Sequence, residues 1–241
     1  MPVDTNRGFY EYFEDFLVTA IGDLPEVDVV SATGVTTAIL ANQVGGVVEV
    51  PVGSSNDDDV AAVSTNLNWH AGANGQLIGS VRMKVDTSVA DMKWFIGFGD
   101  SIASADETSF SATSDTVTID TMTDGVGFLF DGDATTLTVW AVAGKTDAVT
   151  VGEALPIRFV PALGVYHTFT VKIGRGATMI EWYIDDEEVH RVDRRQGDTT
   201  SYISTTAPLA LGLWAYEQGT ACEYEVDYIW ASKARHTGDS A

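Results

Sequence analysis

The sequence has 241 residues, a length that suits one large all-β domain, because sandwiches and barrels of this size are often single units. It carries 13 Lys and Arg residues against 35 Asp and Glu residues, for a formal net charge of −22. A field of this sign repels nucleic acid and anionic lipid, so we expect neither as a direct partner. The simplest role of the excess acid is to keep the surface solvated.

Signals for export, cross-linking or membrane insertion are missing from the sequence. Cys222 is the single cysteine, so no intrachain disulfide can form. The first residues, MPVDTNRGFYEYFEDF, lack a charged region followed by an apolar one, so we expect no secretory signal peptide. No run of about eighteen apolar residues is present, so we expect no membrane-spanning helix.

The N-terminal segment, residues 1–18, is predicted to be an arm that attaches to a partner. Residues 1–8 are polar, and residues 9–17 (FYEYFEDFL) are rich in aromatic side chains. Their spacing fits a helical face and a strand almost equally well, and periodicity cannot decide so short a segment. In either case the aromatic side chains are expected to be buried against the body of the protein or against a partner. The predicted partner-binding residues of this segment are Phe9, Tyr10, Tyr12, Phe13 and Phe16.

After the arm, the chain reads as about a dozen short strands separated by turns, with no long helix and no repeat of fixed period. The expected strands lie within 28–50, 61–69, 75–86, 93–99, 125–130, 136–143, 146–161, 166–192, 209–216 and 223–231. The glycines of segment 93–99 (KWFIGFG) imply that another layer packs closely against it. Polar loops are expected at 54–59, 101–115 and 194–200. The pattern predicts an antiparallel β-sandwich.

Residues 166–192 (YHTFTVKIGRGATMIEWYIDDEEVHRV) are predicted to form a three-stranded meander. Apolar and polar residues alternate in it, which places one set on a buried face and the other set on an exposed face. Gly174 and Gly176 suit the first turn because glycine tolerates a positive φ angle. Asp185 and Asp186 suit the second turn.

The order of several motifs resembles the concanavalin A-like lectin/glucanase jelly roll, especially the versions carried in structural proteins of tailed phages. The motifs are FEDFL, IGFGD, DGVGFLFDGD, IEWYIDDEEV and the closing EVDYIWA, and together they span about residues 9–232. The resemblance implies a two-sheet antiparallel jelly-roll β-sandwich over residues 19–232, followed by a polar tail at 233–241. A shared fold implies little about activity.

Laminarinase-type glycosidases on this fold need two carboxylates about 5–5.5 Å apart on one strand, in the pattern E-x-D-x-(x)-E. The nearest match is Glu223, Glu225 and Asp227, which would share one face of a strand. The order of acids differs, however, and the segment is the closing strand. In the meander, Tyr183 takes the position between Glu181 and Asp185 where an acid is needed. We therefore predict no catalytic residue and no enzymatic activity.

Metal and cofactor sites are not predicted. The acidic turns 56–59 (NDDD) and 131–133 (DGD) offer oxygen ligands of the kind that Ca²⁺ takes, but neither is a complete loop. A structural Ca²⁺ is the alternative. The four histidines have no zinc-site spacing to one another or to Cys222.

Two further sets of residues are candidates for binding. Arg191, Arg194 and Arg195 form the only basic cluster and could dock an acidic patch on a partner, since Arg is favoured at interfaces. The alternative is local pairing with the acids of 185–188. The six tryptophans all lie in strand-like alternation, which favours the core. Trp69, ahead of a loop rich in Gly and Asn, is the best candidate for stacking on a sugar.

These features predict a non-enzymatic structural protein of a tailed-phage virion, most simply a capsid decoration (cement) protein. Its partners would be the major capsid protein, copies of itself, or both, in a homo-oligomer on the capsid surface. Assembly in the host cytoplasm followed by lysis fits a chain with no signal peptide and no disulfide. The alternatives are a carbohydrate-binding, lectin-like module of a fibre or tail protein and a divergent glycoside hydrolase.

Overall fold

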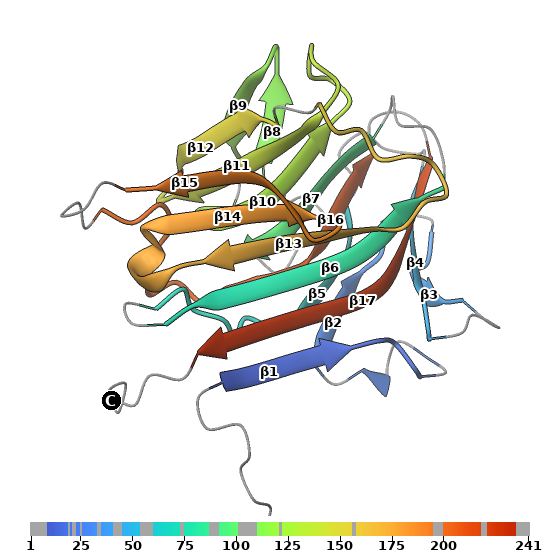
Figure 1. Ribbon diagram of the computed structural model, residues 1–241. Coiled ribbons are helices and arrows are strands. Elements are labelled where there is room, and N and C mark those ends of the chain that lie inside the picture. The colour runs from blue at the N-terminus through green and yellow to red at the C-terminus, as the bar shows by residue number, and fades with distance from the viewer. Residues whose placement is uncertain are drawn as a thin grey trace, which may run out of the picture.

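Two large antiparallel β-sheets packed face to face make up the computed structural model (Figure 1). The structure describes residues 9–18, 20, 23–24, 26–32, 35–40, 45–53, 60–72, 75–86, 92–100, 110–120, 122–155, 158–194, 200–217 and 221–234. This arrangement is the predicted jelly-roll β-sandwich, so the fold class is confirmed. Within these residues no helix is both long and apolar enough to span a membrane.

The first sheet has eight strands. Its order is β15 (Glu187–Asp193), β14 (Met179–Ile184), β13 (His167–Ile173), β6 (Leu77–Val85), β17 (Cys222–Ala234), β4 (Val48–Val52) and β3 (Ala38–Ile39), with β1 (Phe9–Glu14) also paired to β17. The second sheet has seven strands. Its order is β12 (Ala148–Ala154), β11 (Val139–Lys145), β10 (Gly125–Asp131), β7 (Met92–Gly99), β16 (Ala210–Glu217), β5 (Val60–Thr65) and β2 (Val27–Val30). A separate hairpin consists of β8 (Phe110–Thr113) and β9 (Thr116–Ile119).

The meander forms as predicted, and one face of it supplies the core between the sheets. Alternate residues of β13 and β14 are buried there: Phe169, Val171, Ile173, Ile180, Trp182 and Ile184. The indole Nε1 of Trp182 donates a hydrogen bond of 2.7 Å to the carbonyl oxygen of Gly127 in the opposite sheet. The meander therefore forms one side of the eight-stranded sheet, with β15 at its edge, and is hydrogen-bonded to the other sheet.

The two turns of the meander follow the sequence in most respects. Gly176 has φ 66° inside the short 3-10 turn η2 (Arg175–Ala177), whereas Gly174 has φ −73° and needs no glycine freedom. Asp185 and Asp186 have φ 51° and 67°, which is the left-handed backbone of a tight hairpin turn. The Gly174 expectation is thus wrong, and the Asp185–Asp186 expectation is confirmed.

The predicted N-terminal arm belongs to the sandwich over the part that the structure describes. Strand β1 pairs antiparallel with the end of β17, from Phe9 opposite Ala234 to Glu14 opposite Ile229, which decides for strand over helix. Phe16 is fully buried just beyond it. The boundary at residue 18 is therefore not a domain boundary. Residues 1–8 and the tail from 235 lie outside the described residues, and β17 runs two residues past the predicted end of the sandwich at 232.

Apolar side chains on the outer face of the seven-stranded sheet form a second apolar core, which was not predicted from the sequence. The hairpin of β8 and β9 lies over it, where a loop at 101–115 was expected; residues 101–109 lie outside the described part. A Cβ atom on Gly144 would come within 2.5 Å of the side chain of Ile119, and one on Gly99 within 2.3 Å of Met122. For Gly99 the expectation of a closely packed layer is therefore confirmed.

Candidate functional site

The three acids that most resemble a hydrolase motif lie on the outer face of the eight-stranded sheet, but a β-bulge between Val226 and Tyr228 breaks their regular spacing. Asp227 forms an ion pair with Arg82. Glu225 is bound on both oxygens, by the ammonium of Lys84 at 3.0 Å and by the hydroxyl of Tyr166 at 2.6 Å. These groups are tied to neighbours, which suits a structural network.

The same cluster offers ligand atoms to a cation, but it already contains a positive charge. One carboxylate oxygen each from Asp86, Glu223 and Glu225 lies within 4.8 Å of the others. Lys84 Nζ is 2.9 Å from Asp86 and 3.0 Å from Glu225, so its ammonium supplies the charge that a metal would bring. Burial lowers the pKa of Lys84, but the hydrogen bonds to Asp86 and Glu225 outweigh it, and the pKa is raised overall. The lysine therefore remains charged at neutral pH.

Glu223 is expected to make folding stability depend on pH. Burial contributes most to raising the pKa of Glu223 above its ordinary value, followed by the hydrogen bond that its protonated carboxyl donates to Glu49 and by repulsion from the Glu49 charge. A carboxyl group with a raised pKa in the folded state stabilises the fold below its unfolded pKa of about 4.3, and this contribution is lost as pH rises through the folded pKa. Glu223→Gln keeps a hydrogen-bonding group without the charge. Its stability relative to the unmodified protein should therefore rise with pH, as measured by urea unfolding at a series of pH values. A difference that falls with pH would contradict this assignment.

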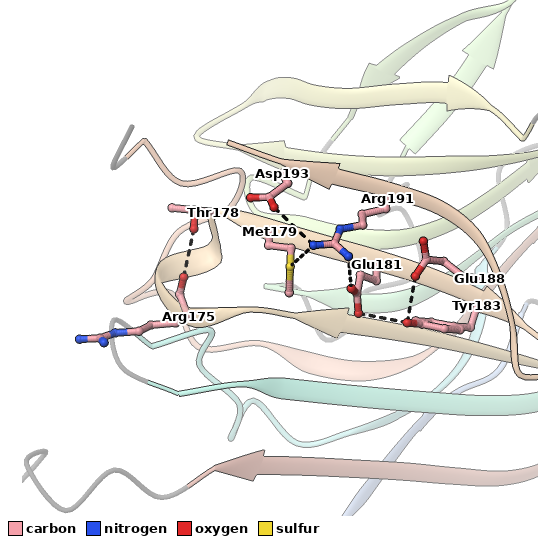
Figure 2. A network of polar contacts seen from close by, with 8 residues as sticks. All are labelled: Arg175, Thr178, Met179, Glu181, Tyr183, Glu188, Arg191 and Asp193. Carbon is pink, nitrogen blue, oxygen red and sulfur yellow. Dashed lines mark hydrogen bonds and ion pairs between the residues drawn. The ribbon is translucent and has the colours of Figure 1, made fainter. Parts of the chain in front are cut away.

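The predicted arginine cluster is divided in the structure. Arg191 lies on the outer face of β15, 3.2 Å from Glu181 and 3.4 Å from Asp193, so local pairing occurs but not with the predicted acids of 185–188 (Figure 2). The guanidinium of Arg194 lies 4.1 Å above the ring of Tyr202. Arg195 lies outside the described residues.

A network of polar contacts surrounds Arg191 on the same face. Figure 2 shows Arg191 between Met179 and Glu181, with Tyr183 further along β14. The hydroxyl of Tyr183 lies 3.1 Å from Glu181 and 3.2 Å from Glu188, and it can donate to one of them at a time. Lys172 places its ammonium 3.8 Å from the centre of the Tyr183 ring. Opposite charges alternate here, so this part of the face is largely self-neutralised.

Two aromatic candidates prove to be buried. Trp69 is 2% exposed, and its indole donates to the hydroxyl of Thr65 at 3.1 Å, so it cannot stack on a sugar. The ring of Tyr10 lies 5.4 Å from it. Phe16 has no exposed surface and cannot contact a partner. The expectations for Trp69 and Phe16 are therefore wrong, because both side chains complete the core.

Phe13 and Tyr10 are the exposed aromatic residues among those described in the segment, at 56% and 41%. Phe13 borders an open hollow of about 400 Å³. Tyr12 is half-buried, and the side chain of Phe9 lies outside the described part of the structure. The hollow lies on the outer face of the eight-stranded sheet, and its lining consists of Glu11, Phe13, Ser80, Tyr228 and Trp230. We call these five residues the aromatic hollow.

Strand register explains how the aromatic hollow forms. Phe13 of β1 lies opposite Trp230 of β17, which lies opposite Ser80 of β6, so the three form one row across the sheet. Trp230 Nε1 donates to Glu11 at 3.0 Å, and the rings of Phe13 and Tyr228 are 5.7 Å apart. In the sequence, the alternation in EVDYIWA is the signal for this arrangement, because it places Tyr228 and Trp230 on the side of the strand opposite to Ile229.

The hairpin of β8 and β9 covers the outer face of the seven-stranded sheet over strand β10. Leu129 of β10 is buried in the apolar layer beneath β8 and β9. The backbone N–H of Ala112 donates to Asp131 at 2.9 Å, and Lys93 bonds to Ser111 in the same hairpin. Of the faces described, the outer face of the eight-stranded sheet is thus the better candidate for binding.

Comparisons with known proteins agree with the fold. No model of a protein family matches the sequence, and no curated protein does. A protein of unknown function from Shewanella oneidensis MR-1, SO2946, superposes with a TM-score of 0.64 at 13% identity over 97% of this chain and 90% of that chain. The β-glucanase of Bacillus licheniformis gives 0.56 at 16% identity, over 94% and 98%. The winged bean acidic lectin, complexed with methyl-α-D-galactose, gives 0.58 at 10% identity, over 95% and 100%.

At these identities the likeness shows the fold alone. The chain has the concanavalin A-like fold shared by glucanases and lectins.

Proposed function

We propose that this protein is a non-enzymatic structural protein of a tailed-phage virion, a capsid decoration protein that binds the major capsid protein on the outside of the shell. The observation that carries the proposal is an apolar loop displayed between β12 and β13. Val160, Leu163 and Val165 are 37%, 51% and 46% exposed. Neighbouring exposed apolar side chains of this kind are typical of surfaces that become buried on association.

The described part of this loop after residue 157 is held in place by hydrogen bonds, which favours a docking role. Gly164 N–H donates to the carbonyl of Val85 at 2.7 Å, and Val139 N–H donates to the carbonyl of Phe159 at 2.8 Å. Tyr166, at the end of the loop, is bonded to Glu225. A loop that is already ordered loses little conformational entropy when it binds.

The state of the acidic side chains supports a role without catalysis. Glu225 and Asp227 are engaged by Lys84 and Arg82, and Glu223 is hydrogen-bonded to Glu49. A retaining hydrolase needs one free carboxylate nucleophile and one proton-donating acid on opposite sides of a glycosidic bond. Charge neutralisation by a lysine and an arginine works against both roles.

A decoration protein would act through repetition. Each copy contributes a modest contact, and the symmetry of a shell multiplies that contact many times, so the assembled layer resists expansion more than one copy could. The acidic surface would keep the outer side of the layer solvated.

Leu163→Glu tests the loop as the contact. A charge placed in an apolar interface should weaken co-sedimentation with capsid shells that lack the protein by about tenfold or more. Val149→Glu is the matched control, because Val149 is also an exposed apolar residue, 36% exposed, but lies at the opposite end of β12. If Leu163→Glu and Val149→Glu bind shells equally well, the loop is not the contact.

A further inference from the structure

The aromatic hollow combines three aromatic rings with one carboxylate. The rings belong to Phe13, Tyr228 and Trp230, and Glu11 supplies the carboxylate. Phe13 and Glu11 are both exposed, so a ring and a negative charge face the solvent side by side. The face of an aromatic ring is partly negative and attracts cations, most strongly in tryptophan. The rings and the carboxylate therefore attract a group of the same sign.

These groups are held in position by one another. Trp230 Nε1 donates to one carboxylate oxygen of Glu11 at 3.0 Å, which keeps the acid next to the indole. The rings of Phe13 and Tyr228 are 5.7 Å apart with an interplanar angle of 39°. Within the described residues, the second carboxylate oxygen of Glu11 accepts no hydrogen bond. It can accept one from a cationic donor, and such charge-assisted hydrogen bonds are the strong ones.

Two other aromatic rings on the same face of the sheet already hold a cation from this chain. The ammonium of Lys172 lies 3.8 Å from the centre of the Tyr183 ring. The guanidinium of Arg82 lies 4.7 Å from the centre of the Tyr166 ring and is also paired with Asp227. Arg82 thus lies between an aromatic ring and a carboxylate, which is the combination that the hollow offers.

In the part of the chain that the structure describes, no cation of the protein occupies the hollow. None of the lining residues is Lys or Arg. Arg82 lies opposite Tyr228 in the strand register but is engaged as described. Lys233 lies on the other face of β17, since it is opposite Tyr10, whose ring packs on the buried Trp69. The rings and the carboxylate are therefore available to a cation from outside.

We propose that the aromatic hollow binds the cationic side chain of an arginine or lysine on the surface of a partner protein, with Trp230 and Phe13 as the ring faces and Glu11 as the counter-charge. The net charge of −22 attracts a basic partner, and the hollow is open, so a side chain that projects from a large molecule can reach it. Arginine suits the site best, because its flat guanidinium stacks on a ring while its edge donates to a carboxylate. This inference does not rest on the capsid role, since the chemistry is the same whichever protein presents the side chain.

The test follows the indole N–H signals of the tryptophans in ¹H–¹⁵N spectra during titration with Nα-acetyl-arginine amide and Nα-acetyl-lysine amide. The Trp230 signal is identified by its loss in Trp230→Phe. It is expected to shift and to saturate at millimolar concentration, while the signals of the buried Trp69 and Trp182 stay in place. Nα-acetyl-citrulline amide has nearly the shape of the arginine compound but no charge, and it should leave the Trp230 signal unmoved. A signal that moves with tetramethylammonium but with neither amino-acid amide would assign the hollow to a small free cation and overturn the proposal.

Variants separate the local site from the charge of the whole chain. Glu11→Gln keeps an oxygen that accepts from Trp230 but removes the counter-charge, and it should weaken binding of the arginine compound about fivefold or more. Phe13→Ala should weaken it about as much, with unchanged circular dichroism because Phe13 lies outside the core. Glu188→Gln is the matched control: it removes one charge from the same face, four strands away from β17, where salt screens it, so binding should stay within about twofold.

Three results overturn the proposal. The first is a Trp230 signal that neither cationic compound moves, and the second is an equal shift with the citrulline compound, which would make the hollow a site for neutral groups. The third is an equal loss of binding in Glu11→Gln and Glu188→Gln, because the attraction would then come from the net charge rather than from the hollow.

Discussion

Replacing Trp182 by alanine is expected to lower the free energy of unfolding by about 3–5 kcal/mol, which is the usual cost of deleting a large buried aromatic side chain. Trp182 is fully buried between the two sheets, and its indole donates to Gly127 of the opposite sheet at 2.7 Å. The change therefore removes core contacts and the hydrogen bond that joins β14 to β10. Urea denaturation followed by circular dichroism measures the loss.

Two further variants separate the contributions to this loss of stability. Trp182→Phe keeps much of the apolar volume but loses the hydrogen bond, and it should cost about 1–3 kcal/mol. Tyr183→Ala, on the next residue of the same strand but on the outer face, should cost clearly less than Trp182→Ala. If Tyr183→Ala destabilises as much as Trp182→Ala, the two faces of the meander have been assigned the wrong way round.

Replacing Gly97 by alanine is expected to be the next most damaging single change, at about 3 kcal/mol or more, because it combines overpacking with backbone strain. Gly97 has φ 154° and lies between Gly127 of β10 and Gly212 of β16. A Cβ atom there would come within 2.2 Å of the carbonyl oxygen of Val126 and 2.5 Å of the Cα of Gly127. Backbone atoms in the centre of a sheet cannot move aside as a flexible side chain can.

Gly164→Ala is the control that measures the cost of backbone strain without overpacking. Gly164 has φ 71°, but the nearest atom to an added Cβ is the Asp86 carboxylate at 3.8 Å, so only the left-handed conformation is penalised. A cost of about 1 kcal/mol is expected in thermal or urea unfolding. Equal costs at Gly97 and Gly164 would show that the strands adapt to the added methyl group.

Much of the sandwich could be predicted from local patterns in the sequence. Residues 166–192 alternate with a period of two and carry turn residues at both bends, so strand, face and turn all follow from the neighbours in the chain. Trp182 and Ile184 were assigned to the core for this reason, and both are buried. Local alternation sets the face of a residue, because a shift of one residue would move every side chain to the other side.

Other features depend on residues that are far apart in the chain. The aromatic hollow joins Glu11 to Trp230 across 219 residues, through the pairing of β1 with β17. Trp69 and Phe16 were candidates for binding a sugar and a partner, and both are buried inside the protein. The ring that packs on Trp69 is that of Tyr10, far away in the chain. The hairpin over the seven-stranded sheet was missed because a strand buried on both faces, such as β10, has no alternation to show which side is covered. Such contacts cannot be derived from one sequence by periodicity.

Cryo-electron microscopy of capsid shells assembled without this protein, before and after addition of the purified chain, tests the central claim most directly. The capsid role predicts new density for a two-sheet sandwich at symmetry-related positions on the outer surface, with its β12–β13 loop towards the shell and occupancy that saturates. Shells whose density is unchanged at saturating protein concentration would contradict it.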